Sequence, residues 1–132
     1  MFTSNRDVFT RWIDAVNAGD VSIVDTVLGT DVVDHHLPPG IPAGREGVRQ
    51  WVGMLIDSLQ LHLDVRETVV QGDLIAWRAI CSGTHVGDYL GFAATNRSFK
   101  CELIAIERFD DGRVVERWEQ VDNMSVMQQL TA

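Results

Sequence analysis

The chain lacks several features that would define a specialised class of protein. It has only two cysteines, Cys81 and Cys101, and three prolines in 132 residues. No run approaches the roughly 18 apolar residues of a membrane-spanning helix, and the first residues, Met1 to Asp7, lack the basic and apolar regions of a signal peptide. We therefore expect a cytoplasmic protein whose two cysteines are reduced and buried.

Positive charge is also scarce. The chain has 11 Lys and Arg against 19 Asp and Glu, a formal net charge of −8. Nucleic-acid binding needs a cationic face that displaces counterions, and anionic membranes attract basic segments. We therefore expect neither nucleic acid nor a membrane as a partner. Hydrophobic residues make up 45% of the chain and charged residues 23%, which is typical of a globular domain rather than a disordered one.

No repeat, low-complexity tract or linker divides the chain, so we expect a single domain over residues 1–132. Helical periodicity predicts helices over residues 4–18, 21–28 and from 44 onwards. A period of two predicts strands over residues 31–36, 61–71, 74–83, 97–109 and 113–123, and a last turn or strand over 124–130. This order favours an α+β fold, with three N-terminal helices on a strongly bent antiparallel or mixed sheet. Such a cone has an apolar interior suited to a small molecule.

Four ordered stretches carry recognisable motifs. They are Val33–Gly40 with Gly44–Gly47, then Gly72–Arg78, then Gly83–Gly91, and finally Arg108–Asp122 with Gln128–Leu130. Together they resemble the SnoaL-like polyketide cyclase family, which has the NTF2-like fold. The resemblance covers nearly the whole chain and implies a cofactor-independent enzyme. In well-understood members an aspartate removes a proton from an activated carbon, and the enolate attacks a carbonyl in an intramolecular aldol step.

The resemblance implies that Asp122 is this base, because its spacing from Trp118 matches. From the residues alone, Trp118, Gln120 and Asp122 alternate onto one face of the last predicted strand. If that face lines the cone, a carboxylate there lies beside an indole and an amide and can act as a base on a carbon acid. The alternative is that Asp122 caps backbone N–H groups of the tail.

An enolate oxygen needs a hydrogen-bond donor. The candidates are His35, His36, His85 and Gln120. His35 and His36 are adjacent on a predicted strand, so at most one points inward. We assign His35 and Gln120 to catalysis and His36 and His85 to binding, with the choice among the histidines open. The family often has Asn where this chain has His36, which implies a different polar contact.

Apolar side chains are expected to hold an apolar substrate, such as a polycyclic one. The expected binding residues are Trp12, Trp51, Leu55, Tyr89, Phe92 and Trp118. An ordinary core role is the alternative, above all for Trp12. The opposite sheet face is expected to carry Ile104, Ile106, Val115, Val121, Arg108, Arg117 and Glu119. It is too apolar to be fully hydrated, which suggests a homodimer that buries it.

Other motifs are missing from the sequence. There is no HExxH, no clustered Cys/His spacing, no GxSxG and no GxGxxG, so we expect neither a metal nor a nucleotide cofactor. The Arg-x-Asp pattern of limonene epoxide hydrolases is not evident at Arg78 or Arg108. Three functions stay open: a cofactor-free cyclase or isomerase, an epoxide or ester hydrolase in which Asp122 activates water, and a non-catalytic protein that binds a small molecule.

Overall fold

The structure, a computed structural model, describes residues 4–131. Within this range the elements are α1 (Asn5–Asn17), a short 3-10 helix η1 (Val21–Ile23), α2 (Val24–Val27), β1 (Leu28–Asp34), α3 (Gly44–Leu59), β2 (His62–Gln71), β3 (Leu74–Thr84), β4 (Ser98–Asp110), β5 (Arg113–Val121) and α4 (Asn123–Thr131). The predicted α+β class with its N-terminal helices is confirmed. The tail differs from the prediction, because it forms the helix α4.

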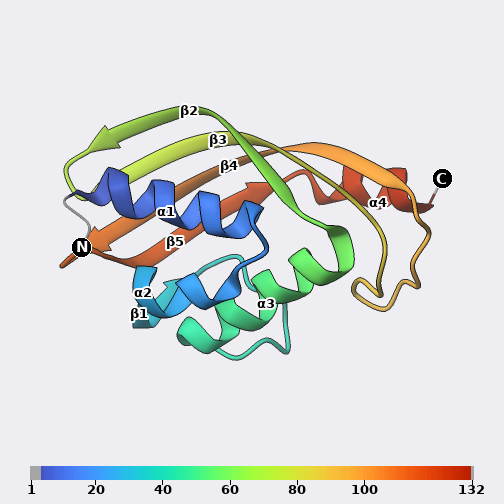
Figure 1. Cartoon of the computed structure of the whole chain (residues 1–132), viewed down its shortest axis with the longest axis horizontal. Coiled ribbons are helices and arrows are strands. Elements are labelled where there is room, and N and C mark those ends of the chain that lie inside the picture. Colours follow the sequence, from blue (N-terminus) through green and yellow to red (C-terminus); the bar gives the residue numbers. More distant parts are fainter. Residues whose placement is uncertain (1–3, 132) are drawn as a thin grey trace.

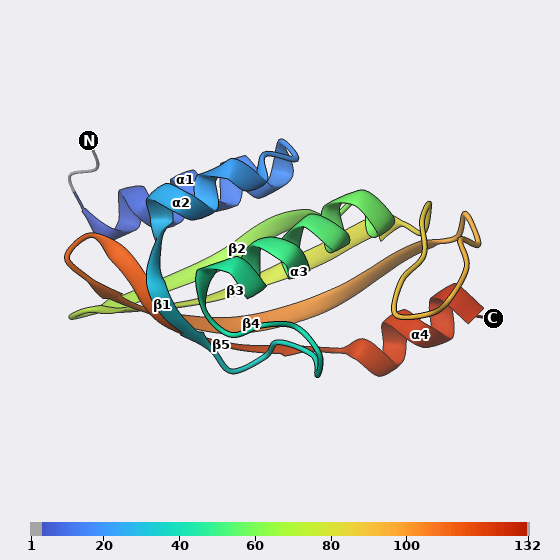
Figure 2. The same cartoon turned by 90° about the horizontal axis from the view of Figure 1, so that it is seen from below.

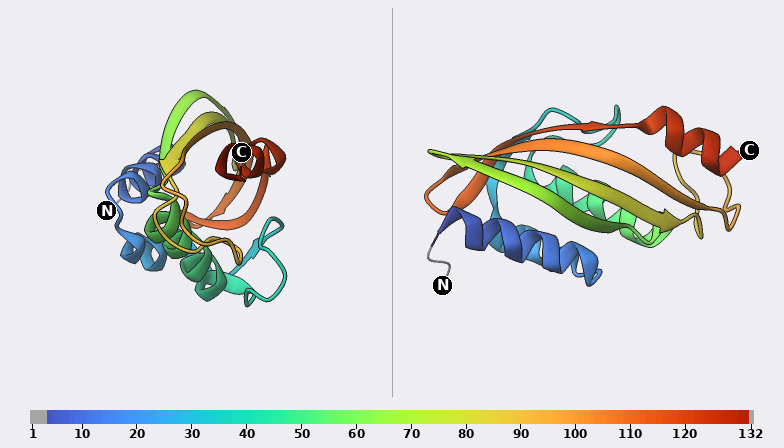
Figure 3. Two further views of the ribbon diagram at one scale, coloured as in Figure 1. Left: turned by 90° about the vertical axis from the view of Figure 1, so that its right-hand side faces the viewer. Right: turned by 90° about the horizontal axis from the view of Figure 1, so that it is seen from above.

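The strands form one curled sheet in the order β1-β5-β4-β3-β2. β1 runs parallel to β5, and the other neighbours are antiparallel, so the sheet is mixed. Helices α1 to α3 lie along one side of the long curved strands (Figures 1 and 2). The end-on view shows the sheet curving around an interior, with α4 and the β3–β4 loop at one end (Figure 3). The bent sheet and its helices match the predicted cone.

Local sequence explains where α1 begins and which side it buries. The Ser4 hydroxyl accepts a hydrogen bond from the Asp7 backbone N–H at 3.1 Å, a standard N-cap contact. The buried side of the helix consists of Val8, Phe9, Trp12, Ile13 and Val16. These residues form one apolar face, because residues three or four apart share one side of a helix.

A glycine allows close packing where the proline-rich loop crosses α3. A Cβ atom on Gly47 would overlap the Pro42 carbonyl oxygen, so no other residue fits there without movement. The loop between β1 and α3 therefore lies directly on the helix. His36 stands at the start of this loop, and its backbone N–H donates to the Asp34 carboxylate at 2.8 Å.

The two faces of β5 are opposite to those that the sequence analysis predicted. Trp118 and Gln120 lie on the outer face, whereas Arg117, Glu119 and Val121 line the interior. Side chains alternate along a strand, so an error of one residue exchanges the whole set. The physical reason lies in β4, where Glu107 stands directly opposite Arg117. Pairing these two charges on the inner face gives each a partner of opposite charge. The adjacent Trp118 then points to the outer face.

Register also brings the two cysteines together. Cys81 of β3 stands directly opposite Cys101 of β4, and both are free and buried, which confirms their predicted burial.

Within the described range, no helix is both long and apolar enough to cross a membrane.

Candidate functional site

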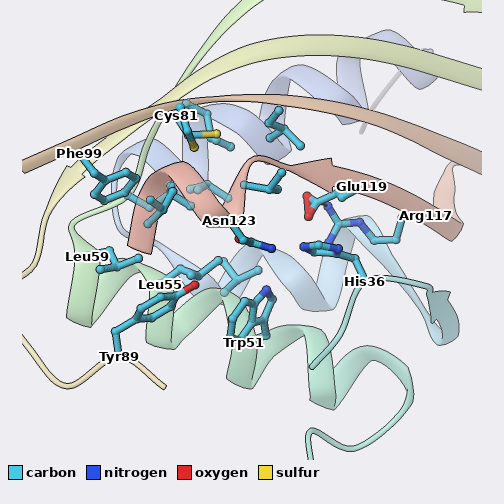
Figure 4. Close-up of a pocket in the computed structure, with 18 of the residues that line it drawn as sticks. His36, Trp51, Leu55, Leu59, Cys81, Tyr89, Phe99, Arg117, Glu119 and Asn123 are labelled. Atoms are coloured by element: carbon cyan, nitrogen blue, oxygen red, sulfur yellow. Dashed lines mark hydrogen bonds and ion pairs between the residues drawn. The ribbon is translucent and has the colours of Figure 1, made fainter. Parts of the chain in front are cut away.

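A cavity lies between the concave side of the sheet and helices α1, α3 and α4 (Figure 4). This inner pocket has a volume of about 80 Å³. A second cavity of about 240 Å³, here called the vestibule, includes Pro38, Leu90 and Met127. Both cavities are lined by His36, Trp51, Tyr89 and Asn123. The shared residues make the vestibule the outer continuation of the inner pocket.

The inner pocket is apolar over most of its wall. Helix α3 contributes Trp51, Leu55 and Leu59, and the β3–β4 loop contributes Tyr89, whose ring centroid is 6.3 Å from that of Trp51. Phe99 comes from β4. Apolar and aromatic walls with few polar groups are characteristic of small-molecule sites.

One end of the inner pocket is formed by a buried charge cluster around Arg117. Its Nε donates to Glu107 Oε2 at 3.1 Å, and its Nη2 donates to Glu107 Oε1 at 3.3 Å. Nη1 donates to Asp34 Oδ2 at 3.0 Å, and Nη2 also donates to Glu119 Oε1 at 3.1 Å. One guanidinium therefore binds three carboxylates.

Two indoles complete this cluster. The Trp77 Nε1–H donates to Glu107 Oε1 at 3.3 Å, and the Trp12 ring lies 5.5 Å from the Arg117 guanidinium carbon. Burial raises the pKa of the Glu107 carboxyl, and the neighbouring Arg117 acts in the opposite direction. Burial works against the charged form of Arg117, but the surrounding carboxylates raise its pKa above the usual range. Arg117 is therefore a permanent cation inside the protein.

Glu119 is the carboxylate of this cluster that lines the inner pocket, and its side chain is 16% exposed. Neither Glu107 nor Asp34 lines that pocket. Among the described residues, only Arg117 hydrogen-bonds Glu119, and it does so through Oε1, which leaves Oε2 available. Figure 4 shows the Glu119 carboxylate, the His36 ring and the Asn123 amide at the same end of the pocket. This end combines an acceptor with two potential donors.

The structure brings together five of the residues selected from the sequence. The inner pocket is lined by Trp12, His36, Trp51, Leu55 and Tyr89. They come from α1, the β1–α3 loop, α3 and the β3–β4 loop. Of the two adjacent histidines, His36 is therefore the one that points inward.

His35 and Gln120, the predicted catalytic donors, lie elsewhere. The His35 ring stacks on Trp118 at 5.3 Å, and its Nε2 lies 2.7 Å from Glu116 Oε2. These groups are on the outer face of the sheet, where Gln120 is exposed. Trp118 was predicted to bind substrate, and it shares this outer position. For Trp118 and Gln120, the reason is the exchanged parity of β5.

Asp122 is exposed at the junction of β5 and α4. Its Oδ1 accepts a hydrogen bond from the Ser125 backbone N–H at 3.1 Å, so it caps the start of α4. This is the alternative role considered for it in the sequence analysis. It does not line the inner pocket, although the adjacent residue Asn123 does.

His85 and Phe92, both predicted to bind substrate, also lie outside the inner pocket. His85 is completely buried, with Nδ1 at 3.0 Å from Thr95 Oγ1 and its ring against Tyr89. Within residues 4–131, no group hydrogen-bonds its Nε2. Phe92 is exposed and pairs through its backbone with Tyr89. Both residues support the loop that carries Tyr89.

The sequence analysis missed Arg117, Glu119 and Asn123 as pocket residues. The available signal was Glu107. The positions that alternate with it along β4 are all apolar, namely Phe99, Cys101, Leu103, Ala105 and Phe109. An acid in such a buried series requires a buried cation. Arg117, followed by Glu119 at the same parity, was the available partner.

The two thiols form another polar feature of the pocket wall. Hydrogen bonding to Cys101 and burial raise the pKa of the Cys81 thiol. The same contact with Cys81 lowers the pKa of the Cys101 thiol.

Known proteins share both the sequence pattern and the fold. The model of the SnoaL-like polyketide cyclase family matches residues 6–130. The chain is 25% identical over 129 residues to the aklanonic acid methyl ester cyclase DnrD of Streptomyces peucetius, covering 94% of this chain and 88% of that protein. It is 25% identical over 121 residues to the nogalonic acid methyl ester cyclase of Streptomyces nogalater, covering 89% and 90%.

A solved structure, that of TsrD from Streptomyces laurentii, superposes with a TM-score of 0.87 at 28% identity, covering 100% of this chain and 98% of that one. Sequence, family pattern and backbone therefore agree over almost the full length. The chain belongs to the SnoaL-like polyketide cyclase family and is an enzyme of the cyclase type.

Proposed function

We propose that the inner pocket catalyses an intramolecular, aldol-type ring closure of a polyketide-derived ester, with Glu119 as the base. The observation that carries this proposal is the position of Glu119, which is the cluster carboxylate with an oxygen free toward the pocket. The substrate class follows the two named relatives, both of which are cyclases of acid methyl esters.

The steps use groups at the polar end of the pocket. Glu119 Oε2 removes a proton from a carbon activated by neighbouring carbonyls, and the electron pair of the C–H bond forms the enolate. His36 and Asn123 are the candidate donors to the enolate oxygen. The enolate carbon then attacks a ketone carbonyl of the same molecule, and the new alkoxide takes the proton back. The apolar wall of the pocket holds the substrate in the folded conformation that ring closure requires.

Glu119→Gln tests this assignment against Asp122→Asn, the alternative that the family resemblance implies. Both variants are incubated in D₂O with methyl benzoylacetate and with β-tetralone, which are probes with activated C–H bonds. We expect Glu119→Gln to lower enzyme-catalysed proton exchange at least about 100-fold, because the pocket loses its base. Exchange is followed by proton NMR.

Asp122→Asn is expected to keep most of the exchange, because the substituted side chain still carries an oxygen that can cap Ser125. The opposite pattern, with exchange lost in Asp122→Asn and kept in Glu119→Gln, would assign the base to Asp122. Circular dichroism of both variants checks that the fold is intact.

Water activation is the second candidate function, and the same cluster favours it. Arg117 and Glu119 lie on the same face of β5, and Asp34 of β1 binds the other side of the guanidinium. The free oxygen of Glu119 could therefore orient a water molecule. Incubation of an aryl epoxide in ¹⁸O-labelled water separates the two chemistries. Labelled diol formation would favour hydrolysis, and a ring closure retains all substrate oxygens without label.

A further inference from the structure

Glu107 is a buried acid, 1% exposed, that the proposed reaction does not use. It lies on β4 directly opposite Arg117 in the register of the sheet. It does not line the inner pocket, so it does not contact a ligand there. Placing an acid at a fully buried position is costly unless it is bonded to a cation. Its partners indicate what it does.

Among the described residues, each hydrogen bond to the Glu107 carboxylate is donated by an N–H group. Arg117 reaches both oxygens, at 3.1 and 3.3 Å, and Trp77 reaches Oε1 at 3.3 Å. An ionised carboxylate is acceptor-only, whereas a protonated one would need a partner for its own O–H. The contacts therefore fit an ionised Glu107.

The same nitrogen of Arg117 serves two carboxylates. Nη2 donates to Glu107 at 3.3 Å and to Glu119 at 3.1 Å. Asp34 takes the opposite side of the guanidinium through Nη1. One positive charge is thus divided among three negative ones. A negative charge on Glu107 therefore offsets part of the attraction between Arg117 and the negative charge of Glu119.

We propose that Glu107 is a positioning residue that keeps Glu119 basic by taking up part of the charge of Arg117. This inference rests on the proposed role of Glu119 as the base. If Glu107 became neutral, more of the Arg117 field would act on Glu119. Its carboxylate would then hold its negative charge more tightly and would accept a proton from carbon less readily.

Other titratable groups surround Glu119, and the substitution of Glu107 leaves them in place. Asp34 comes from β1, and His36 from the loop that follows it. Apart from Arg117, the remaining titratable groups that line the inner pocket are Cys81, Tyr89 and Cys101. Because their positions do not change, a shift in the pH profile reports on the charge of Glu107.

The experiment measures proton exchange from β-tetralone in D₂O across the acid range for Glu107→Gln. We expect the pH of half-maximal exchange to fall by about one to two units, because a charge two hydrogen bonds away is removed. At neutral pH, kcat should fall roughly three- to tenfold with KM unchanged. Glu107→Asp keeps the charge and should keep the wild-type midpoint.

The matched control is Glu102→Gln. Glu102 is on the same strand but on the outer face, where it binds Arg78, so its loss should leave the profile unchanged. If Glu107→Gln does not fold, Asp34→Asn removes a charge from the same guanidinium and should shift the midpoint in the same direction.

Two results would be decisive against these ideas, and they are distinguishable. A folded Glu107→Gln with a lowered thermal midpoint but the wild-type pH profile would show a purely structural role and overturn the inference. Full exchange in Glu119→Gln would instead overturn the base assignment on which the inference rests.

Discussion

Each face of the sheet carries an arginine bound to several carboxylates, but one cluster is buried and the other is exposed to solvent. On the inner face, Arg117 binds three carboxylates at 4% side-chain exposure. On the outer face, Arg78 binds Glu67 and Glu102 at 35% exposure, with contacts of 2.8 Å that are shorter than the 3.0–3.1 Å of Arg117. The distances alone therefore do not make the inner cluster the stronger one. Water does, because it screens the outer cluster and leaves the inner one dependent on its own charges.

The outer face is in turn more apolar than a hydrated surface needs. Ile106 of β4 stands between Ala76 and Trp118 in the register, and Ile104 is 58% exposed nearby. The sheet thus buries charge on the side of the pocket and exposes apolar groups on the side of the solvent. An exposed apolar patch of this kind is typical of an association surface.

The largest difference between the faces should appear in stability. Arg117→Leu leaves Glu107, Asp34 and Glu119 without their cation, and the side chains of the first two are buried. We expect this to cost about 3–5 kcal/mol of unfolding free energy. Arg78→Leu removes an exposed cluster and should cost no more than about 1 kcal/mol. Urea unfolding at neutral pH measures both. Equal losses would show that the inner cluster is not isolated from solvent as the structure indicates.

A second difference should appear in association. We propose that the outer face forms a homodimer, and Ile106→Arg places a charge in the middle of its apolar row. Because Ile106 is 38% exposed, the monomer should still fold. Sedimentation velocity should show a dimer for the wild type and a monomer for the variant. Met124→Arg on α4, which is 74% exposed, is the control that keeps the dimer. A monomeric wild type would contradict the proposal.

The smallest expected difference between the two faces is in how their carboxylates make stability depend on pH. Burial raises the pKa of Glu107, so its contribution to stability is present below the unfolded value of 4.5 and declines as pH rises toward the raised folded value. Hydrogen bonds from His35 and Arg108 lower the pKa of Glu116 on the outer face. Its contribution is present above 4.5 and declines as pH falls through the lowered value.

Glu107→Gln and Glu116→Gln should therefore change the slope of stability against pH in opposite directions. Urea midpoints recorded from about pH 3 to neutral pH cover the range of both carboxylates and test this. Slopes that change in the same direction would show that the two carboxylates do not differ in environment as described.

Elements with one clear apolar period were predictable from the sequence. The alternation in β3 and the i, i+4 pattern in α1 each allow a single buried face. β5 does not, because Trp118 favours one parity and the Arg117–Glu107 pair favours the other. The helix α4 was also missed, since its polar residues, such as Asn123, Ser125 and Gln129, give only a weak helical pattern.

The charge cluster could not be read from spacing, because its members are far apart in the chain. Asp34 and Arg117 are separated by 83 positions and meet only because β1 pairs with β5. The aromatic lining was easier to predict, since large apolar side chains such as Trp51 and Leu55 already share one face of α3. Non-local polar contacts require the topology first.

Asp34 has a consequence for engineering this enzyme. Its Oδ2 binds the Arg117 guanidinium, and its Oδ1 holds the backbone N–H of His36 at the start of the β1–α3 loop. Loop grafting between relatives is a common route to new specificity, and here the graft boundary matters. A transplanted loop that begins before Asp34 would replace a member of the charge cluster together with the intended entrance residues. Exchanges that start after His36 alter the entrance and leave the electrostatics of the pocket intact.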